Sequence, residues 1–182
     1  MVYFSSREVA AISVCAALWS VLSVTVAPLF WQLTHLPFLC DLIGVIALML
    51  ALWWARKPGA VFATGVLATV ITLVLRPGAV HFFGFTAASL VFDLLSWLSG
   101  YERCLERGLL SGFLLLLVSV VSTAVAGVVI GSFFMPSMAL ARMGGLAVFA
   151  GLHALGGLLG GVVGVVVVSA LVSRGVRPSG VA

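Results

Sequence analysis

The sequence predicts an all-helical integral membrane protein, a bundle of six transmembrane helices whose N- and C-termini are both cytoplasmic. Hydrophobic residues make up 63% of the 182 residues and charged residues only 8%, whereas roughly a quarter of an ordinary soluble domain is charged. So few charges cannot cover a water-exposed surface, and high hydrophobicity excludes intrinsic disorder. The apolar residues fall in six runs, most of them about as long as the ~20 residues that a helix needs to cross a bilayer. We therefore expect residues 1–182 to form a single membrane domain.

Breaker residues set the limits of the first three expected helices. The first apolar run stops at Pro28, and the second ends before Arg56-Lys57-Pro58-Gly59. The third run is short and ends at Arg76-Pro77-Gly78. Proline and glycine at such junctions are typical of helix ends. The expected spans are about 9–26, 37–55 and 60–75.

The last three expected helices are delimited in the same way. Ser99-Gly100 and a charged stretch close the fourth run, and Pro136 closes the fifth. The sixth run ends before Arg174. The expected spans are about 79–98, 108–134 and 144–172.

The distribution of Lys and Arg predicts the orientation. With the N-terminus inside, seven basic residues fall in inner segments and two in outer loops. The inner residues are Arg7, Arg56, Lys57, Arg103, Arg107, Arg174 and Arg177, and the outer ones are Arg76 and Arg142. The positive-inside rule then places both termini in the cytoplasm. Because the basic residues lie singly or in pairs at the ends of apolar runs, the net charge of +4 indicates membrane topology and not a nucleic-acid partner.

Small residues predict where helices approach closely. The sixth span carries overlapping GxxxG pairs, formed by Gly156, Gly157, Gly160, Gly161 and Gly164, and this spacing favours helix packing in lipid. In the first span, Ser13 shares a face with Ala17, and Ala16 shares one with Ser20. For these first-span residues two alternatives stay open, namely packing inside the bundle and docking of a partner membrane helix.

Polar and aromatic residues gather in the predicted outer half of the bundle. We expect them to line an outward-facing pocket for a small organic ligand, because aromatic faces stack on flat rings and polar groups orient them. The candidate substrate-binding residues are Trp31, Gln32, His35, Asp41, Arg76, His81, Phe82, Phe85, Arg142 and His153. Alternatives remain for most of them.

Those alternatives are structural. The aromatic residues could form an interfacial belt, and Arg76 and Arg142 could be loop-end charges. Asp41 could instead pair with His35 or Arg76, while His153 could face either the pocket floor or a neighbouring helix. Asp93 lies in the inner half, where we expect it to pair within the bundle or near the cytoplasmic face.

Motifs of catalysis and of cofactor binding are absent from the sequence. It contains no HExxH, no GxSxG and no glycine-rich phosphate loop, so we expect no enzymatic activity and no cofactor. The three histidines come from three segments without ligand spacing, so no metal site is expected. Cys15, Cys40 and Cys104 lack CxxC spacing and are expected to be packing residues.

The six short spans, the inside N-terminus, the small residues of the first helix and the outward pocket together resemble the substrate-binding S components of energy-coupling factor (ECF) transporters. The run Arg56-Lys57-Pro58-Gly59-Ala60, followed by the third span, is similar to the start of this helix in the thiamine-precursor (YkoE-like) group. The resemblance implies a plasma-membrane protein of an ABC-type importer. Its ligand would be a vitamin or precursor, such as thiamine or hydroxymethylpyrimidine.

The resemblance also implies partners. These are a transmembrane coupling protein and two ATPase subunits, which would carry any ATP hydrolysis. The AxxxA docking motif of that family corresponds here to Ser13/Ala17 or Ala16/Ser20. Two other readings stay open: an independent secondary transporter or channel, and a membrane scaffold protein that makes contact through its glycine-rich sixth helix.

Overall fold

The computed structural model describes residues 3–105, 108–176 and 178, and it confirms the predicted helical membrane bundle. No strand occurs among these residues, and five helices are long and apolar enough to cross a membrane. They are α1 (Ser6–Thr25), α3 (Phe38–Ala55), α5 (Phe82–Ser99), α7 (Leu109–Val129) continued by the π-helical turn η1 (Ile130–Phe134), and α9 (Gly145–Ser173). The sixth apolar helix, α4 (Ala60–Leu75), is shorter, as expected. The chain is thus a multi-pass membrane protein.

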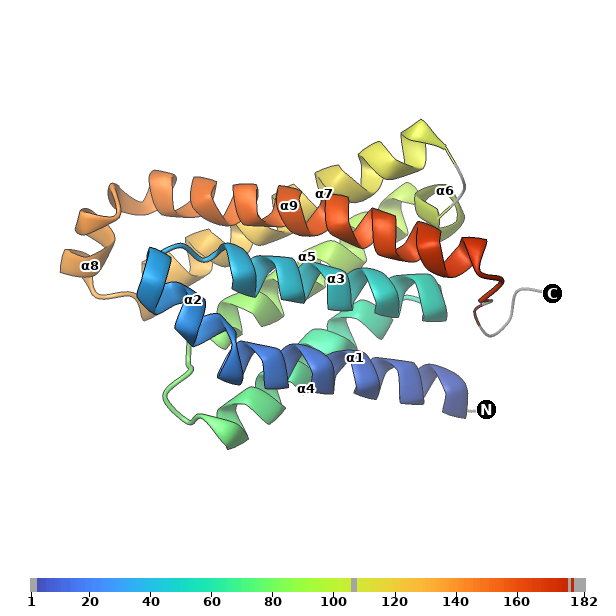
Figure 1. The fold of residues 1–182 in the computed structure, drawn as a ribbon, viewed down its shortest axis with the longest axis horizontal. Coiled ribbons are helices and arrows are strands. Elements are labelled where there is room, and N and C mark those ends of the chain that lie inside the picture. Colours follow the sequence, from blue (N-terminus) through green and yellow to red (C-terminus); the bar gives the residue numbers. More distant parts are fainter. Residues whose placement is uncertain (1–2, 106–107, 177, 179–182) are drawn as a thin grey trace.

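Three short helices connect the long ones. They are α2 (Ala27–Thr34), α6 (Tyr101–Leu105) and α8 (Ser137–Arg142). The sequence analysis predicted none of them, because the runs that form them are too short to show a helical period. Figure 1 shows α2 and α8 at one end of the bundle and the N- and C-termini at the other. We call these the α2/α8 end and the terminal end.

Basic residues divide between the two ends of the bundle. The terminal end carries Arg7, Arg56, Lys57, Arg103 and Arg174, whereas the α2/α8 end carries Arg76 and Arg142. Arg107 and Arg177, which also entered the charge count, lie outside the described residues. The charge count therefore predicts that the α2/α8 end faces outward.

Glycines of α9 let two helices approach it from different sides. A Cβ atom at Gly160 would lie 2.9 Å from the Cα of Leu42 in α3. One at Gly157 would lie 2.7 Å from the backbone oxygen of Ser119 in α7. Because real side chains do not tolerate such distances, the overlapping GxxxG pairs serve packing inside the bundle, one row against each neighbour.

Asp93 caps a neighbouring helix near the terminal end. Helix α4 begins after Gly59, which has no side chain to bond the free N–H groups of the first turn. The Oδ2 of Asp93, from α5, accepts a hydrogen bond from the Phe62 backbone N–H at 3.0 Å. The Tyr101 hydroxyl donates to Oδ1 at 2.8 Å. Asp93 therefore pairs within the bundle, as the sequence analysis expected.

The Arg56–Gly59 turn ties α3 and α4 to other elements. Lys57 Nζ lies 2.8 Å from Oε2 of the buried Glu8 in α1, and Arg56 Nη1 lies 2.9 Å from Oε2 of Glu102 in α6. Arg56 and Gly59 both have positive φ angles, 48° and 85°. Glycine is well suited to that conformation at the start of α4.

Candidate functional site

A cavity of about 310 Å³ lies at the α2/α8 end of the bundle. Its walls come from α1, α2, the start of α3, the α4–α5 turn, α5, η1 and α9. The lining residues are Ser23, Ala27, Pro28, Trp31, Gln32, Pro37, Cys40, Arg76, His81, Phe85, Ile130, Phe134, Met135, Phe149 and His153. Aromatic and apolar side chains dominate this lining, with a few polar groups among them. That composition is typical of a small-molecule site.

Six of the ten candidate residues line this cavity: Trp31, Gln32, Arg76, His81, Phe85 and His153. They are far apart in the sequence, and the alternation of helix direction brings them to one end. Trp31 and Gln32 belong to α2, which continues the chain beyond α1 at this end of the bundle. Arg76 ends α4, and His81 precedes α5 across a short turn.

His153 and Asp41 form a buried pair at the cavity wall. His153 Nδ1 lies 2.8 Å from Asp41 Oδ1, and the two residues are 2% and 1% exposed. The contact joins α9 to α3. Asp41 pairs with His153. It pairs with neither His35 nor Arg76, the two structural partners considered for it above. Both alternatives weighed for His153 hold, since it lines the cavity and also contacts a neighbouring helix.

Each member of the pair has a second polar atom without a hydrogen bond among the described residues, namely Asp41 Oδ2 and His153 Nε2. A buried polar atom left without a partner costs about 1–3 kcal/mol. Such atoms persist in proteins mainly where they serve binding or chemistry, or where water reaches them. The pair therefore marks the polar centre of the site.

Neighbouring rings hold the imidazole of His153 in place. Its ring centroid lies 4.7 Å from that of Phe149 and 6.0 Å from that of Phe85, both nearly edge-on. A Cβ atom at Gly127 of α7 would come within 3.0 Å of the His153 side chain, so glycine at this position makes room for it. Gly156 likewise leaves space for the Asp41 carboxylate.

Four candidate residues lie outside the cavity lining. Asp41 sits behind His153, and Phe82 is buried against Trp19 and Phe85, at centroid distances of 6.0 and 5.3 Å. His35 ends α2 on the exposed surface, where its ring meets Trp31. Arg142 is exposed on α8. These four residues thus lie outside the lining of this cavity, and their assignment to ligand contact stays a prediction.

Several lining residues were not among the candidates predicted from the sequence. Phe149 had a usable signal, because it precedes His153 by four residues and thus shares its helix face. Cys40 was expected to be a packing residue, yet it lines the cavity. Pro28, Pro37 and Met135 also line the cavity, and they lie at or near the ends of the expected spans, where no local pattern indicates a binding role.

The predicted docking residues of α1 fall on different faces. Ala16 and Ser20 are fully buried, and Ser20 Oγ donates to the backbone oxygen of Ala68 in α4 at 2.9 Å. In this structure these two residues pack inside the bundle, which is one of the two alternatives left open for them, and the docking alternative stays a prediction. Ser13 is half-buried and Ala17 is exposed, so that pair lies on the outer side of the bundle.

Within the described part of the chain, no group of three or more His, Cys, Asp or Glu residues is close enough to hold a metal ion. A second cavity, of about 610 Å³, lies at the terminal end. It contains neither histidine nor carboxylate in its lining, so the α2/α8 cavity is the better candidate for ligand recognition.

No protein-family model, no curated protein and no solved structure matches this chain.

Proposed function

We propose that this protein is the substrate-binding S component of an ECF-type importer and that the α2/α8 cavity binds its substrate. The observation that carries the proposal is the buried Asp41–His153 pair at the wall of an aromatic cavity. Polar groups inside a membrane bundle are costly and usually serve function. The charge count predicts that this cavity opens outward, the side from which an importer collects its substrate.

The pair specifies the chemistry of the ligand. In the neutral imidazole, a carboxylate that accepts from Nδ1–H keeps the proton on that nitrogen and leaves Nε2 as an acceptor. The matching ligand group is an N–H or O–H donor. Phe85, Phe149 and Trp31 supply faces and edges for a flat ring. A heteroaromatic vitamin or precursor that carries an amino or hydroxyl group, such as thiamine or its hydroxymethylpyrimidine part, meets both requirements.

The size of the cavity limits the ligand. A volume of about 310 Å³ is near the lower end of small-molecule sites, which span roughly 300–1,000 Å³. This favours a small ring compound over a large cofactor. Delivery would require the coupling protein and two ATPases, and the outer face of α1 with Ser13 and Ala17 is the proposed contact.

The test is native mass spectrometry of the detergent-purified protein, first for a retained small molecule and then for binding of added thiamine and hydroxymethylpyrimidine. We expect His81→Ala and Asp41→Asn each to weaken binding by more than tenfold, about 1.4 kcal/mol. His81 lines the cavity, whereas Asp41 acts through the tautomer of His153. Asp93→Asn is the control, because Asp93 lies at the other end, and it should leave binding unchanged.

Co-purification with co-expressed coupling subunits distinguishes this proposal from its alternatives. An S component should form a stoichiometric complex with them, which an independent transporter would not. Unchanged ligand affinity in both His81→Ala and Asp41→Asn would refute the site, and failure to bind any coupling subunit would refute the class.

A further inference from the structure

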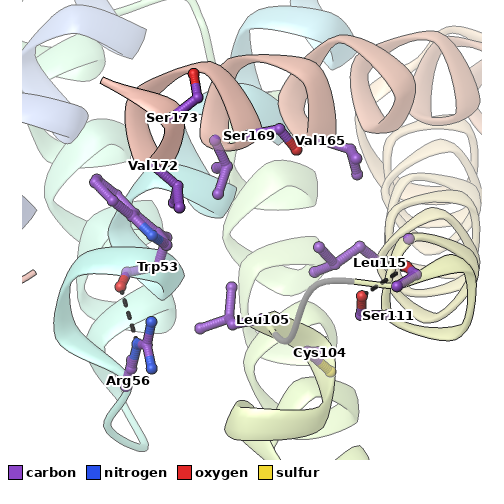
Figure 2. A pocket seen from close by; sticks show the side chains of 13 residues that line it. Trp53, Arg56, Cys104, Leu105, Ser111, Leu115, Val165, Ser169, Val172 and Ser173 are labelled. Atoms are coloured by element: carbon purple, nitrogen blue, oxygen red, sulfur yellow. Dashed lines mark hydrogen bonds between the residues drawn. The ribbon is translucent and has the colours of Figure 1, made fainter. Parts of the chain in front are cut away.

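The second cavity has an amphiphilic lining. Helices α3, α6, α7 and α9 surround it at the terminal end, as Figure 2 shows. Its apolar wall consists of Leu105, Leu115, Val165, Val168 and Val172. Its polar groups are the guanidinium of Arg56 and the hydroxyls of Ser111, Ser169 and Ser173.

The cavity exists because close packing between α7 and α9 stops part-way along the helices. Cβ atoms at Gly157 and Gly161 would meet α7 within 3 Å, at the backbone oxygen of Ser119 and at the side chain of Leu116. After Gly164 the helix continues with four valines in a row. Branched side chains hold neighbouring helices apart. In Figure 1, α7 and α9 diverge toward the terminal end.

Arg56 keeps donor capacity for an anion. Its Nε–H donates to the Trp53 carbonyl at 3.4 Å, and its Nη1 contacts Glu102. Among the described residues these contacts use two of the five N–H donors of a guanidinium. The side chain of Glu102 is 72% exposed, so this ion pair is a weak surface interaction.

We propose that this cavity binds an anionic phospholipid, with the phosphate at Arg56 and an acyl chain along the valines of α9. Charge complementarity favours this occupant, since Arg103 also lies at this end. The apolar wall favours a lipid over a free phosphate, which would leave it uncovered. The start of α7 beside the cavity presents Leu109, Leu110 and Phe113 to the surroundings, with Leu109 97% exposed. Lipid therefore borders this region.

The charge count adds an argument of its own, because it predicts that this end faces the cytoplasmic leaflet, where anionic lipids are enriched and attract basic residues. The proposal uses no residue of the α2/α8 cavity and does not depend on the proposed function.

The test is native mass spectrometry of delipidated protein incubated with an equimolar mixture of phosphatidylglycerol and phosphatidylcholine. We expect the wild type to retain phosphatidylglycerol at least fivefold over phosphatidylcholine. Arg56→Gln should abolish this preference, whereas Glu102→Gln should keep or raise it. Both variants break the same ion pair, and only the first removes the cation. The comparison therefore distinguishes loss of the lipid-binding cation from a structural effect of losing the ion pair.

A second matched pair tests the acyl-chain contact. Val168→Phe fills the cavity and should lower lipid retention severalfold, whereas Val166→Phe, on an exposed face of the same helix, should not. Equal losses in Arg56→Gln and Glu102→Gln would overturn the proposal. So would unchanged retention in Val168→Phe, or binding of glycerol 3-phosphate as tight as that of the lipid, which would indicate a free-anion site.

Discussion

At the scale of single residues, the Asp41–His153 pair stands out because two titratable groups are buried together inside the bundle. Two titratable side chains, each nearly inaccessible, share one hydrogen bond in an apolar interior. Removing one member of such a pair leaves the other buried and uncompensated. The pair therefore affects stability as well as the proposed binding.

A double-mutant cycle measures this coupling. We expect His153→Ala to lower the free energy of unfolding by about 3–5 kcal/mol, because it strands the Asp41 carboxylate. Adding Asp41→Ala should restore part of the loss, so the two effects should be non-additive by at least about 1 kcal/mol. Unfolding in mixed micelles, followed by circular dichroism, is the measurement. Additive losses would contradict a direct interaction.

Because of Tyr101, we expect the free energy of unfolding to depend on pH in the alkaline range. Burial, together with the hydrogen bond to Asp93 and the charge of its carboxylate, raises the pKa of the Tyr101 hydroxyl above its ordinary value. The unfolded chain then loses this proton near pH 10 while the folded chain keeps it. Stability is therefore unaffected below about pH 10 and falls as the pH rises further.

The comparison is with Tyr101→Phe, which has no proton to lose. We expect the melting temperature of the wild type to fall more steeply between pH 10 and 11 than that of Tyr101→Phe. Parallel pH profiles would contradict the assignment.

At the scale of elements, α9 is the axis of the packing, with glycine rows toward α3 and α7. We expect Gly160→Ala to destabilise the protein by about 1–3 kcal/mol, because its Cβ would meet backbone that cannot rotate away. Gly151→Ala on the same helix is the matched control. Nothing lies within 4 Å of a Cβ there, so it should be neutral or stabilise by up to about 1 kcal/mol. Equal unfolding free energies for the two variants would refute this packing role.

The long helices were predictable from the sequence, and their bounds lie within a few residues of the expected spans, because apolar runs between breakers are a strong signal. The site was predictable only as a set of residues at one end. Asp41 and His153 are 112 positions apart, and no local pattern indicates which of several polar residues will meet. Phe82 and Phe85 show the same limit, because both are buried phenylalanines on one helix and only Phe85 lines the cavity.

At the scale of the whole molecule, the charge distribution predicts orientation. We expect Gly78→Cys, in the exposed α4–α5 turn of a variant lacking the native cysteines, to react with a membrane-impermeant thiol reagent in intact cells. Pro58→Cys, in the exposed turn at the terminal end, should react only after lysis. The opposite labelling pattern would contradict this orientation and would show that the α2/α8 cavity lies on the cytoplasmic side.

The cap that Asp93 provides has a consequence for biogenesis. Helix α4 has 16 residues and thus a length of about 24 Å, less than the roughly 30 Å of hydrocarbon. The Phe62 amide in its first turn finds its acceptor only on α5, which is synthesised later. A nascent chain that ends at α4 therefore holds a short span with an unpaired polar amide. We therefore expect α4 and α5 to insert into the bilayer together as a hairpin.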